Sequence, residues 1–144
     1  MMDRLYLIAT IAGQPVAIRA SAIDSVVDIG DVTPVPRAPA HVAGLAALRS
    51  RVLTIICCER ALGLPAPTRR ATRGVVVAID GNHYGLLVSA IDDACVIEDE
   101  VRPVRTRLDA GWEKVALGMI DFGEETLLLI DPSQLVAGPD LLAA

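Results

Sequence analysis

The sequence predicts an all-β fold built from two related units. Short runs of β-branched and aliphatic residues recur along the 144 residues, and turn residues separate them. Part of the sequence also occurs twice, because Ser21-Ala22-Ile23-Asp24 returns as Ser89-Ala90-Ile91-Asp92 at an offset of 68 (89 minus 21). No segment has the sustained hydrophobic period of a long helix. We therefore expect small barrels, in which a closed sheet has no exposed edges, with at most short helices.

The repeat extends beyond this identity. At the same offset Gly13 falls on Gly81, and a second block at an offset of 74 (118 minus 44) places Gly44 on Gly118. Self-similarity at a fixed spacing is typical of duplicated architecture. The expected division is one domain of residues 1–144 with two subdomains, roughly residues 1–68 and 69–144, between which strands can be exchanged.

Six segments have the composition of strands. Each half opens with a predicted hairpin, since Ala12-Gly13 and Asp80-Gly81 stand between paired runs and Asp-Gly is a strong hairpin signal. Short helical turns are expected at residues 21–26 and 59–64. The predicted strands are residues 5–11, 14–18, 52–58, 74–79, 84–88 and 126–130.

Two proline-containing segments are predicted loops. Residues 64–73 read Leu-Pro-Ala-Pro-Thr-Arg-Arg-Ala-Thr-Arg, which suits a surface crossing between the units because proline removes backbone donors and arginine stays in water. Residues 31–39 contain Pro34, Pro36 and Pro39, so this loop should be extended and stiff.

Composition excludes several classes of protein. Hydrophobic residues make up 53% and aromatic residues 3%, so the core must consist of Val, Ile, Leu and Ala. A net charge of -5 argues against nucleic-acid binding, and the cluster of Arg69, Arg70 and Arg73 is most simply a solvated linker. No apolar run approaches the ~20 residues of a membrane helix, and the first residues lack a signal-peptide pattern. We expect a cytoplasmic protein without direct membrane insertion.

Catalytic and metal chemistry have little support in the sequence. The three cysteines are expected to be reduced thiols. Cys57 with His41 or His83 would supply a thiol nucleophile and a base, but the apolar flanks of Cys57 raise a thiol pKa. The cysteines and histidines also lack the spacing of metal ligands. The sequence therefore predicts no catalytic residue, no metal site and no cofactor.

A family resemblance rests on the order of several motifs. Val26-Val27-Asp28-Ile29 precedes the proline-rich loop, and Gly44-Leu45-Ala46-Ala47-Leu48-Arg49 then leads into an apolar strand. Gly85-Leu86-Leu87-Val88 and Leu127-Leu128-Leu129-Ile130-Asp131 continue the pattern over nearly the whole chain. This layout resembles the bacterial chemotaxis coupling protein family, CheW. The resemblance implies a non-enzymatic adaptor of two five-stranded antiparallel β-barrels, which joins the cytoplasmic tips of chemoreceptors to the regulatory domain of a histidine kinase.

The resemblance also implies residues that bind partners. Arg49 matches the family's arginine at the receptor-facing surface, although an arginine there can also satisfy loop carbonyls. Strand alternation puts Val26 and Asp28 on one face, where solvation is the other explanation. Gly44 matches a turn glycine that a positive φ would explain. The predicted partner-binding residues are Val26, Asp28, Gly44, Leu48, Arg49, Val75, Val76, Leu86 and Val88.

Two surfaces are expected from this set. The first half would meet the receptor or one kinase barrel, and apolar strand edges near residues 75–79 and 86–88 would meet another barrel. Pairing of barrels in this way can close into rings of the protein with itself or with the kinase.

Departures from the family pattern leave other partners open. The family's Asn-Leu-Arg-Gly is here Ala47-Leu48-Arg49-Ser50, and Cys57 and Ser89 stand where the family has aspartate. The chain can therefore serve a different receptor–kinase pathway.

Binding of a small ligand in a barrel is a further alternative. Trp112 and Phe122 would line such a pocket, although core positions explain two isolated aromatic residues more simply. Barrels that bind oligonucleotides need exposed aromatics among basic charges, which this sequence lacks.

Overall fold

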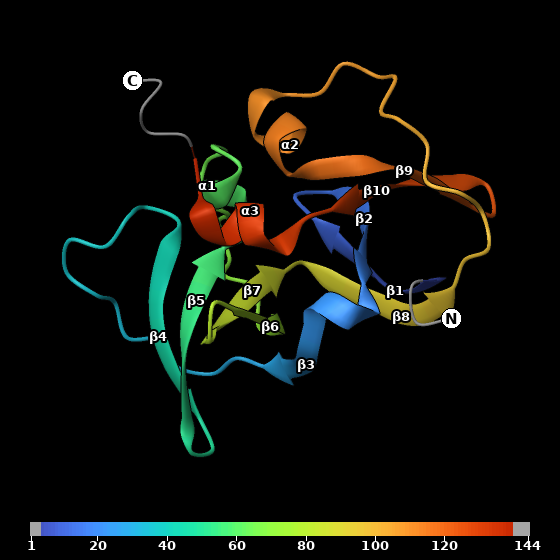
Figure 1. Cartoon of the computed structure of the whole chain (residues 1–144). Coiled ribbons are helices and arrows are strands. Elements are labelled where there is room, and N and C mark those ends of the chain that lie inside the picture. The colour runs from blue at the N-terminus through green and yellow to red at the C-terminus, as the bar shows by residue number, and fades with distance from the viewer. Residues whose placement is uncertain (1–3, 140–144) are drawn as a thin grey trace.

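Two five-stranded sheets contain all the strands of residues 4–139, the part of the chain that the computed structural model describes (Figure 1). The strands are β1 (Leu5–Ile11), β2 (Gln14–Arg19), β3 (Ile23–Asp28), β4 (Val42–Leu48), β5 (Arg51–Cys57), β6 (Arg73–Ile79), β7 (Asn82–Val88), β8 (Ala90–Val96), β9 (Ala116–Phe122) and β10 (Glu125–Ile130). The short helices are the 3-10 turn η2 (Ala20–Ala22), α1 (Cys58–Ala61), α2 (Ala110–Val115) and α3 (Pro132–Ala137). The predicted mostly-β fold is confirmed.

The sheet orders show how the duplication is built. One sheet has the order β8-β1-β2-β10-β9 and the other has β3-β6-β7-β5-β4. Each strand of the first half has a counterpart five strands later, so that β1 corresponds to β6 and β5 to β10. Replacing each strand by its counterpart converts one sheet order into the other. Each sheet thus combines the opening hairpin of one half with three strands of the other half. The division into subdomains near residue 68 stays a prediction, because both sheets draw strands from both halves.

Pairing within each sheet follows the same plan. Four strand pairs join the two halves, and two of them, β2 with β10 and β5 with β7, are parallel. The other pairs are antiparallel, as expected. The sheets curl but do not hydrogen-bond into closed cylinders, so β3 and β4 remain edge strands of one sheet, and β8 and β9 of the other.

The two predicted opening hairpins are confirmed. Ile11 pairs with Gln14 across one turn and Ile79 pairs with Asn82 across the other. Both residues of each turn have positive φ, 51° and 80° at Ala12-Gly13 and 51° and 83° at Asp80-Gly81. Two successive positive φ values define the turn whose twist matches that of the flanking strands. This geometry explains why glycine occupies the second turn position in both copies.

A backbone bridge nearly closes each sheet. The amide of Thr33 donates to the carbonyl of Leu45 at 2.8 Å, and the Leu45 amide donates back at 2.9 Å. A Cβ on Gly44 would lie 2.2 Å from the Thr33 oxygen, so only glycine allows this approach. Gly44, whose φ is 149°, is therefore needed for the backbone itself.

The second half has an equivalent bridge between Arg102 and Met119, beside Gly118. A further repeat accompanies the bridges: Val32-Thr33-Pro34-Val35 returns as Val101-Arg102-Pro103-Val104 at an offset of 69 (101 minus 32). The sequence analysis missed this repeat, although the sequence alone contains it.

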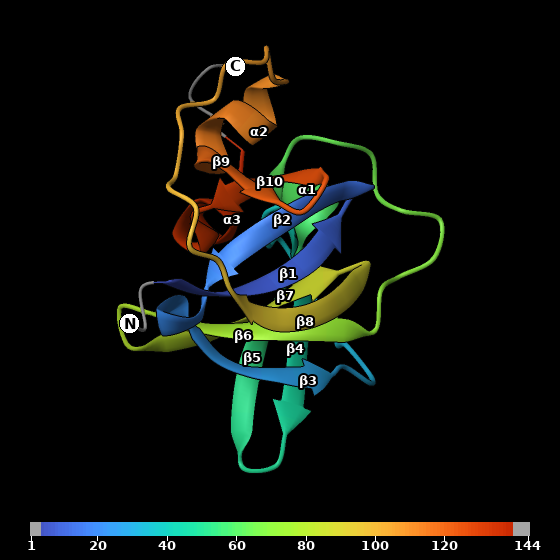
Figure 2. The ribbon, with the colours of Figure 1, turned by 90° about the vertical axis from the view of Figure 1, so that its right-hand side faces the viewer.

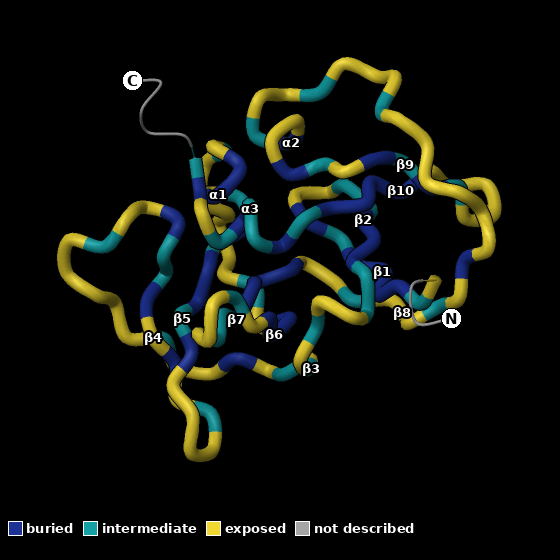
Figure 3. Tube along the Cα trace, in the orientation of Figure 1, coloured by how far each residue is buried: buried dark blue, intermediate teal, exposed yellow. Residues whose placement is uncertain are grey.

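Three apolar clusters form the core. The largest lies between the two sheets, and each sheet also curls around a smaller one. Equivalent residues fill the two smaller clusters, for example Ile29 and Ile97, and Leu53 and Leu127. Figure 3 shows the buried parts of the trace concentrated where the sheets meet. The duplication therefore extends to the side chains of the core.

Helices cover one end of the cluster between the sheets (Figures 1 and 2). Cys58 of α1, Trp112 of α2 and Leu135 of α3 all pack into it. Trp112 is thus a core residue, whereas Phe122 ends β9 with 37% of its surface exposed, so a core position for Phe122 is wrong. No helix within residues 4–139 has the length and apolar character to cross a membrane.

Candidate partner-binding groove

A groove of about 640 Å³ opens between β3 and the hairpin formed by β4 and β5. We call it the edge groove, because β3 and β4 are the two edges of the same sheet. The Thr33–Leu45 bridge joins these edges at one end, and the groove lies at the other, where the β4–β5 hairpin projects from the sheet (Figure 1). Its lining residues are Asp24, Ser25, Val26, Val27, Asp28, Leu48, Arg49, Ser50, Arg51, Leu53 and Val76.

Strand β3 forms one wall. Val26 is 36% exposed and Asp28 is also exposed, whereas Val27 faces inward and Ile29 is buried. The predicted alternation of this strand is confirmed. The Asp28 carboxylate pairs with the Arg73 guanidinium of the adjacent strand at 3.1 Å. Because 86% of the Asp28 side chain is exposed, this pair stabilises the fold little.

The tip of the β4–β5 hairpin forms the other wall. Leu48 pairs with Arg51, which leaves Arg49 and Ser50 as a two-residue turn. Arg49 adopts a φ of 58°, in the left-handed region that L-residues rarely occupy. Within residues 4–139 the Arg49 guanidinium has no ion pair or hydrogen bond, so it does not satisfy loop carbonyls. It is free to meet a partner.

The floor of the edge groove is apolar. Leu53 and Val76 are almost fully buried, at 1% and 2% exposure, and both line the groove from below. Val26 and the half-buried Leu48 rise above this floor. An apolar floor with a free cation at the rim suits a partner that presents an aliphatic side chain next to a carboxylate.

A family model described as the CheW-like domain matches residues 5–139. The chain belongs to the CheW-like domain family. It is 36% identical over 73 residues to a chemotaxis protein CheW of Rhizobium meliloti, a match that covers 49% of this chain and 47% of that protein. It is 25% identical over 144 residues to a probable chemotaxis protein CheW of Rhizobium etli, which covers 99% of this chain and 93% of that protein.

The fold comparison agrees with this membership. The scaffolding protein TtCheW of Thermoanaerobacter tengcongensis superposes with a TM-score of 0.76 at 20% identity, over 90% of each chain. The resemblance seen in the motifs is thereby confirmed, and the CheW-like fold accounts for the two sheets.

Five of the nine predicted partner-binding residues of this CheW-like domain line the edge groove: Val26, Asp28, Leu48, Arg49 and Val76. Gly44 does not, because it is buried at the Thr33 bridge and has a structural role there.

The remaining three, Val75, Leu86 and Val88, were wrongly predicted to bind a partner. They have at most 1% exposure and belong to the cluster between the sheets. The expected apolar strand edges are wrong here, because β6 and β7 are interior strands of their sheet. Side chains packed between the two sheets, with none of them lining the groove, cannot touch a partner while the fold is intact.

The sequence analysis missed three exposed apolar side chains of this CheW-like domain. Three apolar side chains, those of Val96, Leu117 and Phe122, are 61%, 51% and 37% exposed. All three lie on β8 and β9, the edge strands of the sheet that does not form the edge groove. By the two offsets, Val96 corresponds to Asp28 (96 minus 28 is 68) and Phe122 to Leu48 (122 minus 48 is 74). The internal repeat was the signal that could have located Val96 and Phe122, since their counterparts both line the edge groove.

Burial sets the chemistry of two cysteines. Burial raises the pKa of the Cys57 thiol, and the nearby Glu59 carboxylate raises it further. Burial raises the pKa of the Cys58 thiol well above its ordinary value, since this side chain is fully buried. Both thiols therefore stay protonated near neutral pH and are poor nucleophiles. Within residues 4–139, no cluster of three His, Cys, Asp or Glu side chains is suited to hold a metal ion.

Proposed function

We propose that this CheW-like domain is a non-enzymatic adaptor of bacterial signal transduction, which couples the cytoplasmic tips of chemoreceptors to the regulatory domain of a chemotaxis histidine kinase. The observation that supports it most is the state of Arg49. A non-glycine residue with positive φ costs about 1–2 kcal/mol. The two-residue turn itself requires this conformation, as at Ala12 and Asp80, and glycine would suit it better. The choice of an exposed arginine that has no partner among the described residues is best explained by a contact with another protein.

The edge groove is the proposed site for one of these partners, through Val26, Asp28, Leu48 and Arg49. The names of the relatives, chemotaxis proteins and a scaffolding protein, support the pathway. In this function the protein is cytoplasmic and is recruited to membrane receptor arrays. The departures at Ser50, Cys57 and Ser89 keep a divergent receptor–kinase pair as the alternative partner set.

An adaptor needs a second surface, and the edges that carry Val96 and Phe122, the counterparts of Asp28 and Leu48, are the best candidates. Their strands, β8 and β9, correspond to the strands that flank the edge groove. The adjoining hairpin carries Glu124 and Glu125 where the first half has Ser50 and Arg51, so the two surfaces differ in charge. Two unlike surfaces on one chain make heterologous contacts, which can close into rings.

Co-sedimentation tests the proposal. The adaptor, a receptor signalling fragment and the kinase of the same organism are mixed, and the pelleted fraction is measured for the wild type, Arg49→Ala and a control, Arg105→Ala. Arg105 is also an exposed arginine, but it lies outside the edge groove. Arg49→Ala should fold normally and lower recovery of the adaptor with receptor or kinase. Unchanged ternary recovery would overturn the assignment of this groove.

A further inference from the structure

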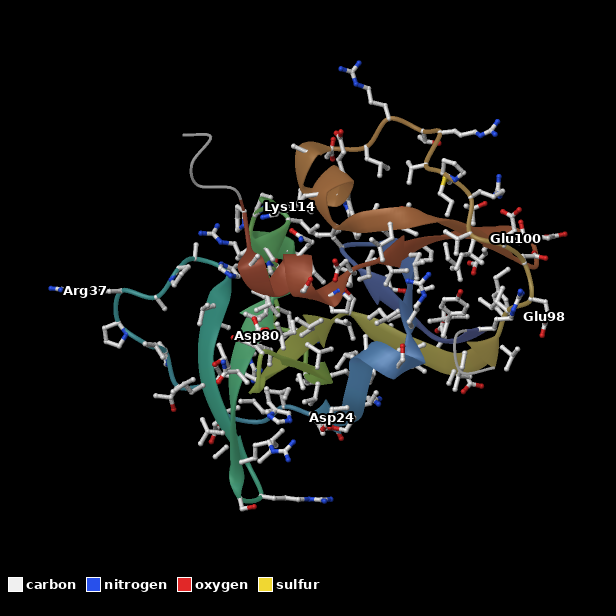
Figure 4. All side chains as sticks on the ribbon, in the orientation of Figure 1. Asp24, Arg37, Asp80, Glu98, Glu100 and Lys114 are labelled. Atoms are coloured by element: carbon white, nitrogen blue, oxygen red, sulfur yellow. The ribbon has the colours of Figure 1, made fainter. Side chains whose placement is uncertain are left out.

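One ion pair crosses the edge groove. The Arg51 guanidinium, at the start of β5, lies 3.4 Å from the Asp24 carboxylate on β3. The pair therefore connects the hairpin wall to the opposite wall, at the end of the groove away from the Thr33 bridge. Figure 4 labels Asp24 near the start of β3, higher in the view than the tip of the β4–β5 hairpin. The Asp28–Arg73 pair differs, because both of its residues lie on paired strands of one wall.

Of the two arginines at the tip of the β4–β5 hairpin, only Arg51 forms an ion pair among the described residues. Arg51 pairs with Asp24, whereas Arg49, two residues earlier, is unpaired among the described residues. Both members of the pair are accessible, with 51% and 43% of their side chains exposed. A carboxylate from another protein can reach Arg51 only in competition with Asp24.

The second half of the chain lacks this arrangement. Asp24 corresponds to Asp92 (92 minus 24 is 68), and Arg51 corresponds to Glu125 (125 minus 51 is 74). Both counterparts are acidic, so no ion pair can form between them. The crossing pair is therefore specific to the edge groove rather than a feature of the duplicated fold.

We propose that Asp24 is an internal competitor of the partner: its carboxylate holds Arg51 until a partner carboxylate replaces it. This inference rests on the proposed function of the edge groove. The ligand would be a protein surface with two carboxylates beside an aliphatic side chain. One carboxylate binds Arg49, the second takes Arg51 from Asp24, and the aliphatic side chain packs between Val26 and Leu48.

The strength of the crossing pair suits this role. An exposed pair held by one contact is weak, so its competition is expected to lower partner affinity only about two- to fivefold. Such a pair can be displaced, yet it penalises partners that bring an aliphatic group without a second carboxylate. Asp24 would then be a specificity-determining residue of the groove.

Titration of a receptor signalling fragment, and separately of the kinase regulatory domain, tests this inference. Asp24→Asn keeps the size of the side chain and removes its charge. It should tighten binding of the groove's partner about two- to fivefold at low salt, and the gain should shrink as salt screens the charges. The matched control, Asp92→Asn, removes the same charge from the second half and should leave binding of the edge groove's partner unchanged.

A double-mutant cycle separates competition from simple repulsion. If Asp24 acts by holding Arg51, Asp24→Asn should give no gain in an Arg51→Gln background, whereas simple repulsion of an acidic partner would give the same gain in both backgrounds. A persistent gain, or no gain in Asp24→Asn while Arg49→Ala still weakens binding, would overturn the competitor role alone. If Arg49→Ala also binds normally, the proposed function of the edge groove fails as well.

Discussion

Arg49 and Gly123 occupy equivalent positions, each as the first residue of a two-residue hairpin turn, with φ values of 58° and 63°. The offset between them, 123 minus 49, is the same 74 residues that relates the last strands of the two halves. The backbone conformation is thus conserved within the molecule while the side chain is not. One copy uses glycine, which this conformation favours, and the other uses the arginine that we place at the partner-binding rim.

Arg49→Gly should separate stability from binding. Glycine relieves the left-handed conformation but loses more entropy on folding, so the free energy of unfolding should be unchanged or higher by up to about 1 kcal/mol. Urea unfolding measures the free energy of unfolding, and co-sedimentation with receptor and kinase measures the expected loss of binding. A marked drop in stability would show that the Arg49 side chain supports the fold.

Gly44→Ala should disturb the Thr33 bridge. The new Cβ would lie 2.2 Å from the Thr33 oxygen at a residue whose φ is 149°. We expect the free energy of unfolding to fall by about 2 kcal/mol or more. Gly30→Ala is the control, because a Cβ there meets nothing within 4 Å, and its effect should stay within about 0.5 kcal/mol. Equal stability of both variants would contradict the close approach.

Gly138→Ala should loosen the contact between α3 and the loop before β4. The His41 ring nitrogen Nε2 lies 2.8 Å from the Val136 oxygen, and a Cβ on Gly138 would come within 2.4 Å of the same ring. Gly63→Ala is a control for a positive φ in open surroundings, with a φ of 80°, and Gly138 adds to its similar φ a ψ of −171° that also favours glycine. The control should cost about 1–2 kcal/mol for the φ alone. Thermal unfolding should show a larger loss for Gly138→Ala, and similar losses would argue against packing on His41.

Cys58 should make the protein sensitive to alkali. Its thiol pKa in the folded protein lies well above the ordinary value of about 8.5, because the side chain is fully buried. As pH rises through that value, the unfolded chain releases this proton and the folded chain keeps it, so stability falls by up to about 1.4 kcal/mol per pH unit. Below that range the thiol is protonated in both states and adds no pH dependence.

The free energy of unfolding is measured for the wild type and for Cys58→Ala between pH 8 and pH 10. This interval brackets the ordinary thiol pKa of about 8.5. The variant will be less stable throughout, because it leaves a small cavity. Its decline with pH should be shallower than that of the wild type. If the unfolding free energies of the two proteins decline equally with pH, the raised thiol pKa of Cys58 is contradicted.

The strands that the sequence revealed are the interior ones. All six predicted strands, residues 5–11, 14–18, 52–58, 74–79, 84–88 and 126–130, became interior strands of the two sheets. Interior strands are buried on both faces and read as continuous aliphatic runs. The edge strands β3, β4, β8 and β9 were not predicted from composition, because one face of each meets water and admits Asp, Ser, Ala and Gly.

The same logic explains what was missed in the site. Val75, Leu86 and Val88 were placed at partner-binding edges because they are apolar, yet an unbroken apolar run indicates an interior strand. The helical turn expected at residues 21–26 is limited to Ala20–Ala22, and the following β3 is a strand. The edge groove itself depends on how one sheet curls until its two edges approach, which no local pattern encodes.

The exchange of strands between the halves determines how this protein must fold. Val16 pairs with Leu128, 112 residues later (128 minus 16), so the first hairpin completes its sheet only after nearly the whole chain has been made. Contacts this distant in sequence slow folding. A fragment cut within residues 64–73 would leave each half with an incomplete sheet, and the two pieces would regain the fold only by associating. We therefore expect the duplicated protein to fold as one cooperative unit, although its sequence reads as two.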